Sequence, residues 1–182
     1  QGLTSGLSII TSQKFGAKNE DDVRKSFAAS ILISSAVAII TTILSVLLAR
    51  PLLELLQTPS EIIDDAWAYL VIIFLGIPAT VLFNLLSNAV RALGDSKTPL
   101  YFLIFACCIN IILDLVFILY FHLGVVGAGI ATILSQLLSG ILCIFFIIKK
   151  VPILWLKKTD FQMHYEVITS HLSIALPMAF QM

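Results

Sequence analysis

The chain has 182 residues, of which 59% are hydrophobic and 12% charged, and its mean hydropathy is +1.02. This apolar content exceeds what a soluble domain of this size needs for its core, so we expect the excess to face lipid. Eleven Lys and Arg balance eleven Asp and Glu. Without a net basic patch, the chain is not expected to bind nucleic acid.

Six apolar stretches follow one another along the chain. A spanning helix needs about 20 residues to cross roughly 30 Å of hydrocarbon. Four stretches reach this length without Lys or Arg, namely 27–49, 66–90, 98–121 and 125–148. The stretch 1–13 resembles the second half of a further span, and 167–182 the start of another. We therefore predict an all-α, polytopic membrane bundle, and we expect it to be an excised piece of a longer protein.

The polar connections between these stretches carry nearly all of the positive charge. Ten of the eleven Lys and Arg lie in the segments 14–26, 91–97 and 149–165. An even number of spans separates each segment from the next, so all three should lie on one side of the membrane. The positive-inside rule assigns that side to the cytoplasm. We predict a multi-pass protein of the cell (inner) membrane.

Residues typical of helix ends predict where the spans begin and end. The segment 50–57 is too short to span and is amphipathic, which favours a short helix at the outer surface. Thr58 and Glu61 match a capping box that would start the next helix. Gly94 can adopt the left-handed conformation that ends a helix, and Asp95 can cap the helix that follows.

Asp114 is the one carboxylate within the four complete spans. An ionised carboxylate deep in a bilayer is costly, so Asp114 should either be protonated or face partners or water inside the bundle. Intramembrane carboxylates commonly mark ion or proton pathways. A structural hydrogen bond to a neighbouring helix is the alternative.

Depth in the membrane groups further polar residues with Asp114. Asp114 lies nine residues before Leu123 in the turn at 122–124, and Thr132 lies nine residues after it. Both should lie roughly 13 Å below the turn, side by side in an antiparallel pair. Asn110 and Gln136 lie one helical turn away from Asp114 and Thr132, respectively. These oxygen donors suit Na⁺, or a proton carried by Asp114, although Asn and Thr also join membrane helices by hydrogen bonds alone.

Two backbone features near this group concern packing. Pro78 lies in the middle of the stretch 66–90 and should kink its helix and free a carbonyl. A stripe of small residues, which should allow close approach beside Thr132, consists of Gly124, Gly127, Ala128 and Ala131.

The chain offers little support for an enzyme. Its three His and three Cys lack metal-ligand spacing, and no phosphate-binding glycine loop is present. We find no Ser or Cys that is expected to accompany a buried His, so nucleophilic catalysis has little support. We therefore predict no catalytic residues and no cofactor, and no metal apart from Na⁺ as a coupling ion.

Three motifs resemble the multidrug and toxic compound extrusion (MATE) family. They are the run 13–18 (QKFGAK), the turn 91–99 (RALGDSKTP), and the pair Asn110 and Asp114 followed by 127–132 (GAGIAT). The resemblance covers nearly the whole chain. It implies one lobe of a twelve-helix, two-lobe exporter, without its first helix.

The resemblance also implies a domain division. Residues 1–148 would form helices two to six of the N-terminal lobe, 149–165 a cytoplasmic linker between the lobes, and 166–182 the truncated first helix of the C-terminal lobe.

The function that the resemblance implies is secondary active transport. The protein would be a Na⁺- or H⁺-coupled antiporter that exports cationic drugs or metabolites by alternating access. Family members that bind the coupling ion in the N-terminal lobe use an Asn, an Asp and a Thr, which match Asn110, Asp114 and Thr132. Gln136 would support these ligands, while a further Asp from the first helix is absent from this chain. The expected partners are organic cations, the lipid bilayer and the remainder of the same chain.

Two other functions stay open at this point. A lipid-linked oligosaccharide flippase has a related bundle, but its cavity should carry Arg or Lys for a pyrophosphate, and the four complete spans contain neither. A non-transporting membrane assembly subunit could instead pair Asp114 with a basic residue of its partner.

Overall fold

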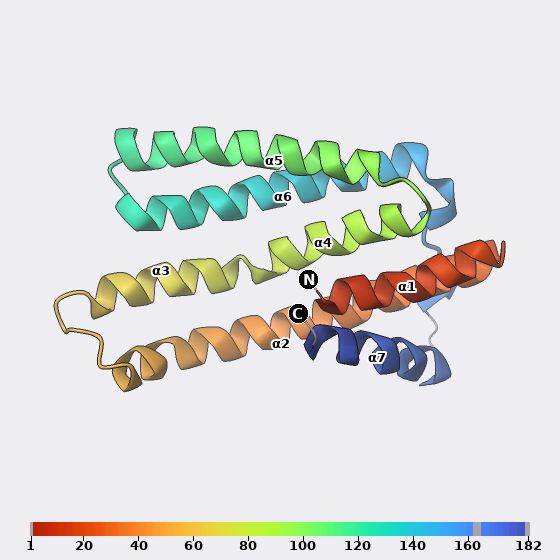
Figure 1. Ribbon diagram of the computed structural model, residues 1–182, viewed down its shortest axis with the longest axis horizontal. Helices are drawn as coiled ribbons and strands as arrows, with labels where there is room; N and C mark the ends of the chain where they lie inside the picture. Colours follow the sequence, from red (N-terminus) through yellow and green to blue (C-terminus); the bar gives the residue numbers. More distant parts are fainter. Residues whose placement is uncertain (1, 162–164, 181–182) are drawn as a thin grey trace.

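The computed structural model describes residues 2–161 and 165–180. In these ranges the regular elements are helices, which run side by side in an elongated bundle (Figure 1). In chain order they are α1 (Gly2–Gly16), α2 (Glu20–Leu55), α3 (Ile63–Leu75), α4 (Ile77–Ala92), α5 (Lys97–Leu115), η1 (Val116–Tyr120), α6 (Gly124–Lys150), η2 (Pro152–Leu154), η3 (Lys158–Phe161) and α7 (Tyr165–Phe180). The predicted all-α fold is confirmed.

Within the described residues, four helical segments are long and apolar enough to cross a bilayer. They are Glu20–Leu55, Ile63–Ala92, Lys97–Tyr120 and Gly124–Lys150, and they match the four predicted spans except that the third ends one residue before Phe121. Many of their large apolar side chains point away from the bundle; Ile40 is 65% exposed and Leu47 is 68% exposed. Such extended apolar surfaces mark contact with a membrane.

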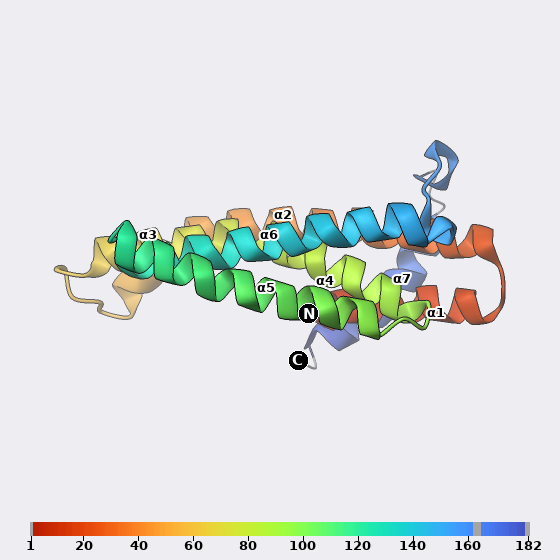
Figure 2. The same ribbon diagram turned by 90° about the horizontal axis from the view of Figure 1, so that it is seen from above.

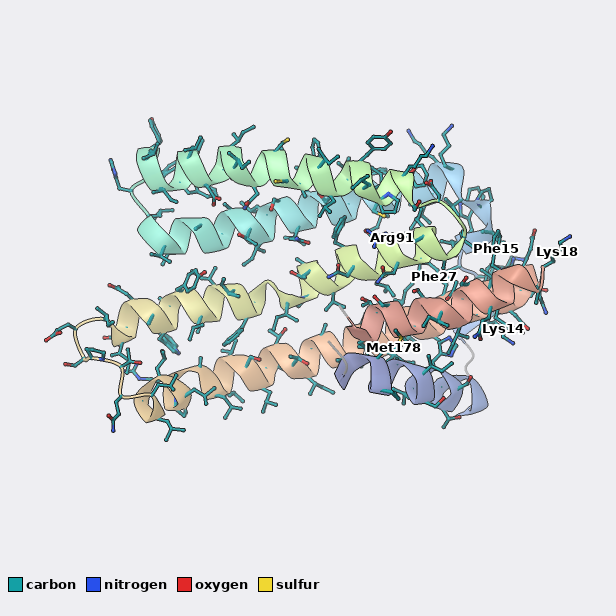
Figure 3. The ribbon with its side chains drawn as sticks, in the orientation of Figure 1. Lys14, Phe15, Lys18, Phe27, Arg91 and Met178 are labelled. Carbon is teal, nitrogen blue, oxygen red and sulfur yellow. The ribbon has the colours of Figure 1, made fainter. Side chains whose placement is uncertain are left out.

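The connections rich in Lys and Arg lie at one end of the bundle. The turn from α1 to α2, the turn from α4 to α5 and the end of α6 all lie toward the right of Figure 1. Figure 3 shows Lys14, Lys18 and Arg91 toward the same end. The prediction that the three basic segments share one side is therefore confirmed.

The opposite end of α2 differs from the prediction. No separate interfacial helix forms at 50–57; instead α2 continues through Pro51. Arg50 secures this end, because its Nε lies 3.5 Å from Glu54 Oε1 and its Nη2 lies 3.3 Å from Asp64 Oδ1. Continuing the helix costs the hydrogen bond that proline cannot donate and crowds the preceding turn, whereas a break would leave several backbone groups unpaired.

The predicted capping box at Thr58 and Glu61 is wrong. The helix begins only at Ile63, and the preceding Ile62 makes no side-chain cap. The Ile62 N–H instead donates to the Pro59 carbonyl oxygen at 3.1 Å, closing a turn before the helix. Two acidic residues in the first turn of α3 supply negative charge at the positive end of the helix dipole.

The turn between α4 and α5 follows the prediction. Gly94 has φ +93°, a left-handed conformation that favours glycine. Asp95 Oδ1 accepts hydrogen bonds from the backbone N–H groups of Lys97 and Thr98 at 3.1 and 3.0 Å, and the Thr98 hydroxyl donates to Asp95 Oδ2 at 2.6 Å. These bonds, first of all that from the Thr98 side chain, lower the pKa of Asp95 below its ordinary value.

The expected kink near Pro78 lies at Gly76, which separates α3 from α4 within one span. Pro78 occupies the first turn of α4, where its missing N–H costs little. A Cβ on Gly76 would lie 2.5 Å from Ile133 Cγ1. Glycine therefore lets α6 approach the chain at the point where the span is interrupted.

α4 lies at the centre of the bundle and contacts α1, α2, α5 and α6. Figure 2 shows α2 and α6 along one face of the bundle, with α1 and α7 toward the other. The largest buried cluster joins α2, α4, α6 and η2, and consists of Val23, Phe27, Leu86, Ala89, Val90, Cys143, Ile147 and Leu154. Apolar packing thus fixes the end of the bundle that carries the basic segments.

The segment after α6 is attached to α2. Asp160 is 5% exposed, and its Oδ2 lies 3.6 Å from Arg24 Nε; Arg24 also pairs with Asp21. The division into an N-terminal lobe, a linker and the start of a C-terminal lobe stays a prediction. Residues 181 and 182 of the last predicted part, and 162–164 of the predicted linker, lie outside the described ranges.

Candidate functional site

The site predicted around Asp114 lies on the antiparallel pair of α5 and α6. The pair is joined by a tight turn between Tyr120 and Gly124, in which His122 has φ +54° and Gly124 has φ +55°. The Leu123 N–H closes this turn by donating to the Phe117 carbonyl oxygen at 3.0 Å. The predicted turn at 122–124 is therefore confirmed, and it aligns the two helices over their length.

Asn110 and Thr132 meet across this pair. Asn110 Nδ2 donates to Thr132 Oγ1 at 3.4 Å, and the Thr132 hydroxyl donates to the Ala128 carbonyl oxygen at 3.0 Å. Thr132 is exposed and Asn110 is half-buried, so their polar atoms lie on a surface that the described residues leave open. The structure thus brings Asn110 and Thr132 together, whereas the count of residues from the turn placed Asp114 beside Thr132. The role of these residues in ion binding stays a prediction.

Asp114 lies one turn beyond Asn110 on α5 and is half-buried. Its Oδ1 atom is buried, yet it has no hydrogen-bond partner within the described ranges. The side chain lines a small pocket of about 180 Å³, whose other lining residues are Ile111, Leu115, Ile118 and Leu119. Buried carboxylate oxygens are nearly always satisfied, so this atom is available to a cation, a proton or a group from another part of the protein.

Gln136 lies one turn from Thr132 on α6. Its Oε1 atom is also buried without a partner among the residues that the structure describes. Ser135, which the sequence did not single out, donates from its hydroxyl to the Thr132 carbonyl oxygen at 2.9 Å. Two side chains of the site therefore have buried oxygens free to accept, one on each helix.

A π-helical turn, η1, begins two residues after Asp114 and was not predicted. A Cβ on Gly127 would lie 2.9 Å from Phe117 Cβ, so the glycine permits close packing of α6 on this turn. Single π-helical turns occur frequently at functional sites. The small-residue stripe was the only sequence signal for this feature, and it indicated close packing without indicating the π turn.

A second polar cluster joins α1, α2 and α7. The hydroxyls of Thr11 and Ser26 are 3.1 Å apart, and Ser26 Oγ lies 2.8 Å from His171 Nε2. The expectation that no Ser accompanies a buried His is therefore wrong, because α7 folds back onto α2. All three residues are at most 2% exposed. A substrate cannot reach Ser26, so the contact holds the helices together.

The MatE family profile matches residues 1–116 of the chain. The probable multidrug resistance protein YpnP of Bacillus subtilis is 39% identical over 155 residues, which are 81% of this chain and 33% of YpnP. The multidrug export protein MepA of Staphylococcus saprophyticus is 27% identical over 178 residues, 97% of this chain and 39% of MepA. The chain therefore spans between 33% and 39% of the length of these two relatives.

Solved transporter structures share the fold. A multidrug resistance MATE family transporter of the MOP superfamily in its outward-facing conformation has a TM-score of 0.91 and 23% identity, over 98% of this chain and 40% of that chain. Its inward-facing conformation gives a TM-score of 0.90 at 23% identity, over 98% and 41%. The predicted architecture, one part of a twelve-helix bundle with two lobes, is confirmed. By its spans and its relatives, the chain is an integral membrane protein that belongs to the MatE family.

Proposed function

We propose that the full-length protein is a Na⁺- or H⁺-coupled antiporter that exports organic cations, drugs or metabolites, by alternating access. The names of its relatives, multidrug resistance and multidrug export proteins, support this proposal. Inward-facing and outward-facing structures of the shared fold support alternation between two states. We further propose that it resides in the cell (inner) membrane, with the segments 14–26, 91–97 and 149–165 in the cytoplasm.

The observation that carries the proposal is the hydrogen bond from Asn110 to Thr132, together with the Oδ1 of Asp114 one helical turn along α5, which has no partner among the described residues. In the proposed site, Asp114 supplies a carboxylate, Asn110 its carbonyl oxygen and Thr132 its hydroxyl oxygen. Gln136 offers a further oxygen one turn along α6. These are hard donors suited to Na⁺, and the carboxylate alone suffices for a proton.

Coupling follows from the charge of Asp114. An ion or a proton neutralises this carboxylate, and a substrate cation bound in the same lobe would compete for the same negative charge. Binding of one therefore disfavours binding of the other. This competition drives transport only if the inward-facing and outward-facing states differ in their affinity for each.

The distribution of positive charge favours a cationic substrate over an anionic one. The stretches 27–49, 66–90, 98–121 and 125–148 contain no Lys or Arg. An anionic head group inside this lobe would lack a basic partner, whereas a cation would find Asp114.

Replacing Asp114 by Asn tests the proposal. Full-length protein in liposomes should expel a fluorescent organic cation when a Na⁺ or a pH gradient is imposed, each gradient being applied separately. Asp114→Asn should lower this gradient-driven rate by about tenfold or more, because the amide cannot carry the proton or the charge. Asp65→Asn makes the same chemical change at an exposed position of α3, and it should leave the rate unchanged. Undiminished efflux by Asp114→Asn would show that Asp114 does not carry the coupling.

A further inference from the structure

A second concave site lies between α2 and α6, away from Asp114. Within the described residues the backbones of these two helices do not come close to each other, and residues of α4 such as Leu82 and Leu86 line the groove between them. The groove has a volume of about 820 Å³, which is within the range of ligand sites. Its lining is almost entirely apolar, and includes Phe27, Ile31, Leu82, Leu86, Ile144 and Ile147.

The segment after α6 covers the end of this groove near the basic connections. Leu154 is 2% exposed and belongs to the core cluster below the groove. Trp155 also lines the groove but is 55% exposed, and its Nε1 donates to the Ile148 carbonyl oxygen at 3.0 Å. Trp is enriched where the hydrocarbon meets the lipid head groups. The groove therefore reaches from hydrocarbon depth to the head-group level.

Positive charge lies at the same end. α6 ends with Lys149 and Lys150, which directly follow the lining residues Ile147 and Ile148, and both Lys are exposed. Basic residues next to a membrane span attract anionic lipid head groups. The apolar groove thus adjoins a site suited to a phosphate.

One buried polar atom in the groove lacks a partner. Ser34 lines the groove and is 1% exposed, and its Oγ has no hydrogen-bond partner in the part of the chain that the structure describes. Buried hydroxyls are nearly always paired.

The first and last helices that the structure describes lie away from this groove. Figure 2 shows α1 and α7 toward the side of the bundle opposite α6. α7 packs against α1 and α2, and α1 lies on the far side of α4 from the groove. The face between α2 and α6 is therefore expected to meet lipid.

We propose that this groove binds the acyl chain of an anionic phospholipid from the leaflet that adjoins the basic segments. The chain lies along α4, Trp155 marks the head-group boundary, and Lys149 and Lys150 bind the phosphate. Ser34 lies about two helical turns deeper than Phe27, at the level of the acyl chain, so the ester oxygens of the lipid do not reach its hydroxyl. The site is independent of the transport proposed above, because none of its residues belongs to the group around Asp114.

Photo-crosslinking of the full-length protein tests this site. The probe is phosphatidylglycerol with a diazirine midway along one acyl chain, in bilayers of phosphatidylcholine, and mass spectrometry locates the labelled peptides. Label should concentrate on residues 31–39 and 78–86. Unlabelled phosphatidylglycerol should compete about fivefold better than phosphatidylcholine. Label spread evenly over the exposed residues of all spans would overturn the site, and equal competition would overturn its preference for anionic lipid.

Paired variants test the apolar part of the site. Ser35 lines the groove and is exposed, so Ser35→Phe should fill the groove and reduce labelling about fivefold. Ala36→Phe introduces the same aromatic side chain at the next position of α2, which is also exposed but lies outside the lining. This control should label like the wild type. Unchanged labelling of Ser35→Phe would contradict the site.

The head-group contact is tested by replacing Lys149 and Lys150 together with Gln. This double variant should lose the preference for phosphatidylglycerol. The control replaces Lys18 and Lys97 with Gln, which removes the same charge from the same end of the bundle, and it should keep the preference. If the two double variants show the same preference for phosphatidylglycerol, the assignment of the phosphate to Lys149 and Lys150 is wrong.

Discussion

Asp114 and Thr132 lie at equal distances along the chain from one turn, and counting residues from this turn placed them side by side. The hydrogen bond of 3.4 Å instead joins Thr132 to Asn110, one helical turn further from the turn, so the count found the right helix faces but not the pairing. Such a count is also not enough to orient a carboxylate. The Oδ1 of Asp114 has no partner in the described ranges. The sequence could not predict this, because the rotamer of Asp114 and the π turn η1 next to it depend on how the helices pack.

Thr132 permits a test at the scale of one hydroxyl. Thr132→Val keeps the shape of the side chain but removes the oxygen that accepts from Asn110. We expect ion-coupled efflux by the full-length protein to fall about fivefold, which corresponds to the loss of one hydrogen-bonding oxygen. Thr132→Ser keeps the hydroxyl and should retain most of the activity. The proposed ligand role is refuted if the Val variant transports as well as the Ser variant.

Helix ends were predictable where the signal is local. The turn at Gly94 and Asp95 depends on one left-handed residue and a carboxylate that reaches its neighbours. The outer end of α2 depends on Arg50, which bonds to Asp64 on the next helix. A capping box assigned from Thr58 and Glu61 could not include this contact between two helices, and the assignment was wrong.

The cap at Asp95 predicts a pH dependence of stability. Hydrogen bonds from Thr98 hold the pKa of Asp95 below its ordinary value of 3.8, so the ionised group stabilises the fold. This contribution is complete above the ordinary pKa and is lost as the pH falls through the lower pKa of the folded state. Asp95→Ala should cost about 1 kcal/mol at neutral pH.

Thermal unfolding of the full-length protein in detergent, from neutral pH to below pH 3.8, measures this effect. The difference in unfolding temperature between the wild type and Asp95→Ala should become smaller at the acidic end of this pH range. Thr98→Ser keeps the donor hydroxyl and should follow the wild-type profile. If the difference in unfolding temperature stays constant with pH, the ionised carboxylate is not what stabilises the turn.

At the scale of the whole molecule, α7 is held tightly against the helices that begin the chain. A Cβ on Gly6 of α1 would lie 2.7 Å from Ala175 Cα of α7. The buried cluster of Thr11, Ser26 and His171 ties α7 to α1 and α2. In the predicted division of the chain, this contact joins the N-terminal lobe to the first helix of the C-terminal lobe.

Gly6→Ala tests this contact. The added methyl group would meet backbone, which cannot rotate away, so α1 and α7 would have to separate. We expect a loss of about 1–3 kcal/mol in stability, as for other overpacked sites, and a lower unfolding temperature of the full-length protein. Gly16→Ala lies on the same helix with nothing within 4 Å of the added Cβ, and it should have little effect. Equal unfolding temperatures for the two variants would contradict the close approach.

The sequence by itself determined the spans, the common side of the three basic segments and the turn at Gly94. Each depends on the length, hydrophobicity or end residues of one continuous segment, which are local properties of the chain. Tertiary structure decided the buried Oδ1 of Asp114 that has no partner among the described residues, the contact between Ser26 and His171, and the groove between α2 and α6. Each of these depends on how closely distant segments pack, and the backbones of two helices approach most closely where glycines such as Gly6 and Gly76 leave room.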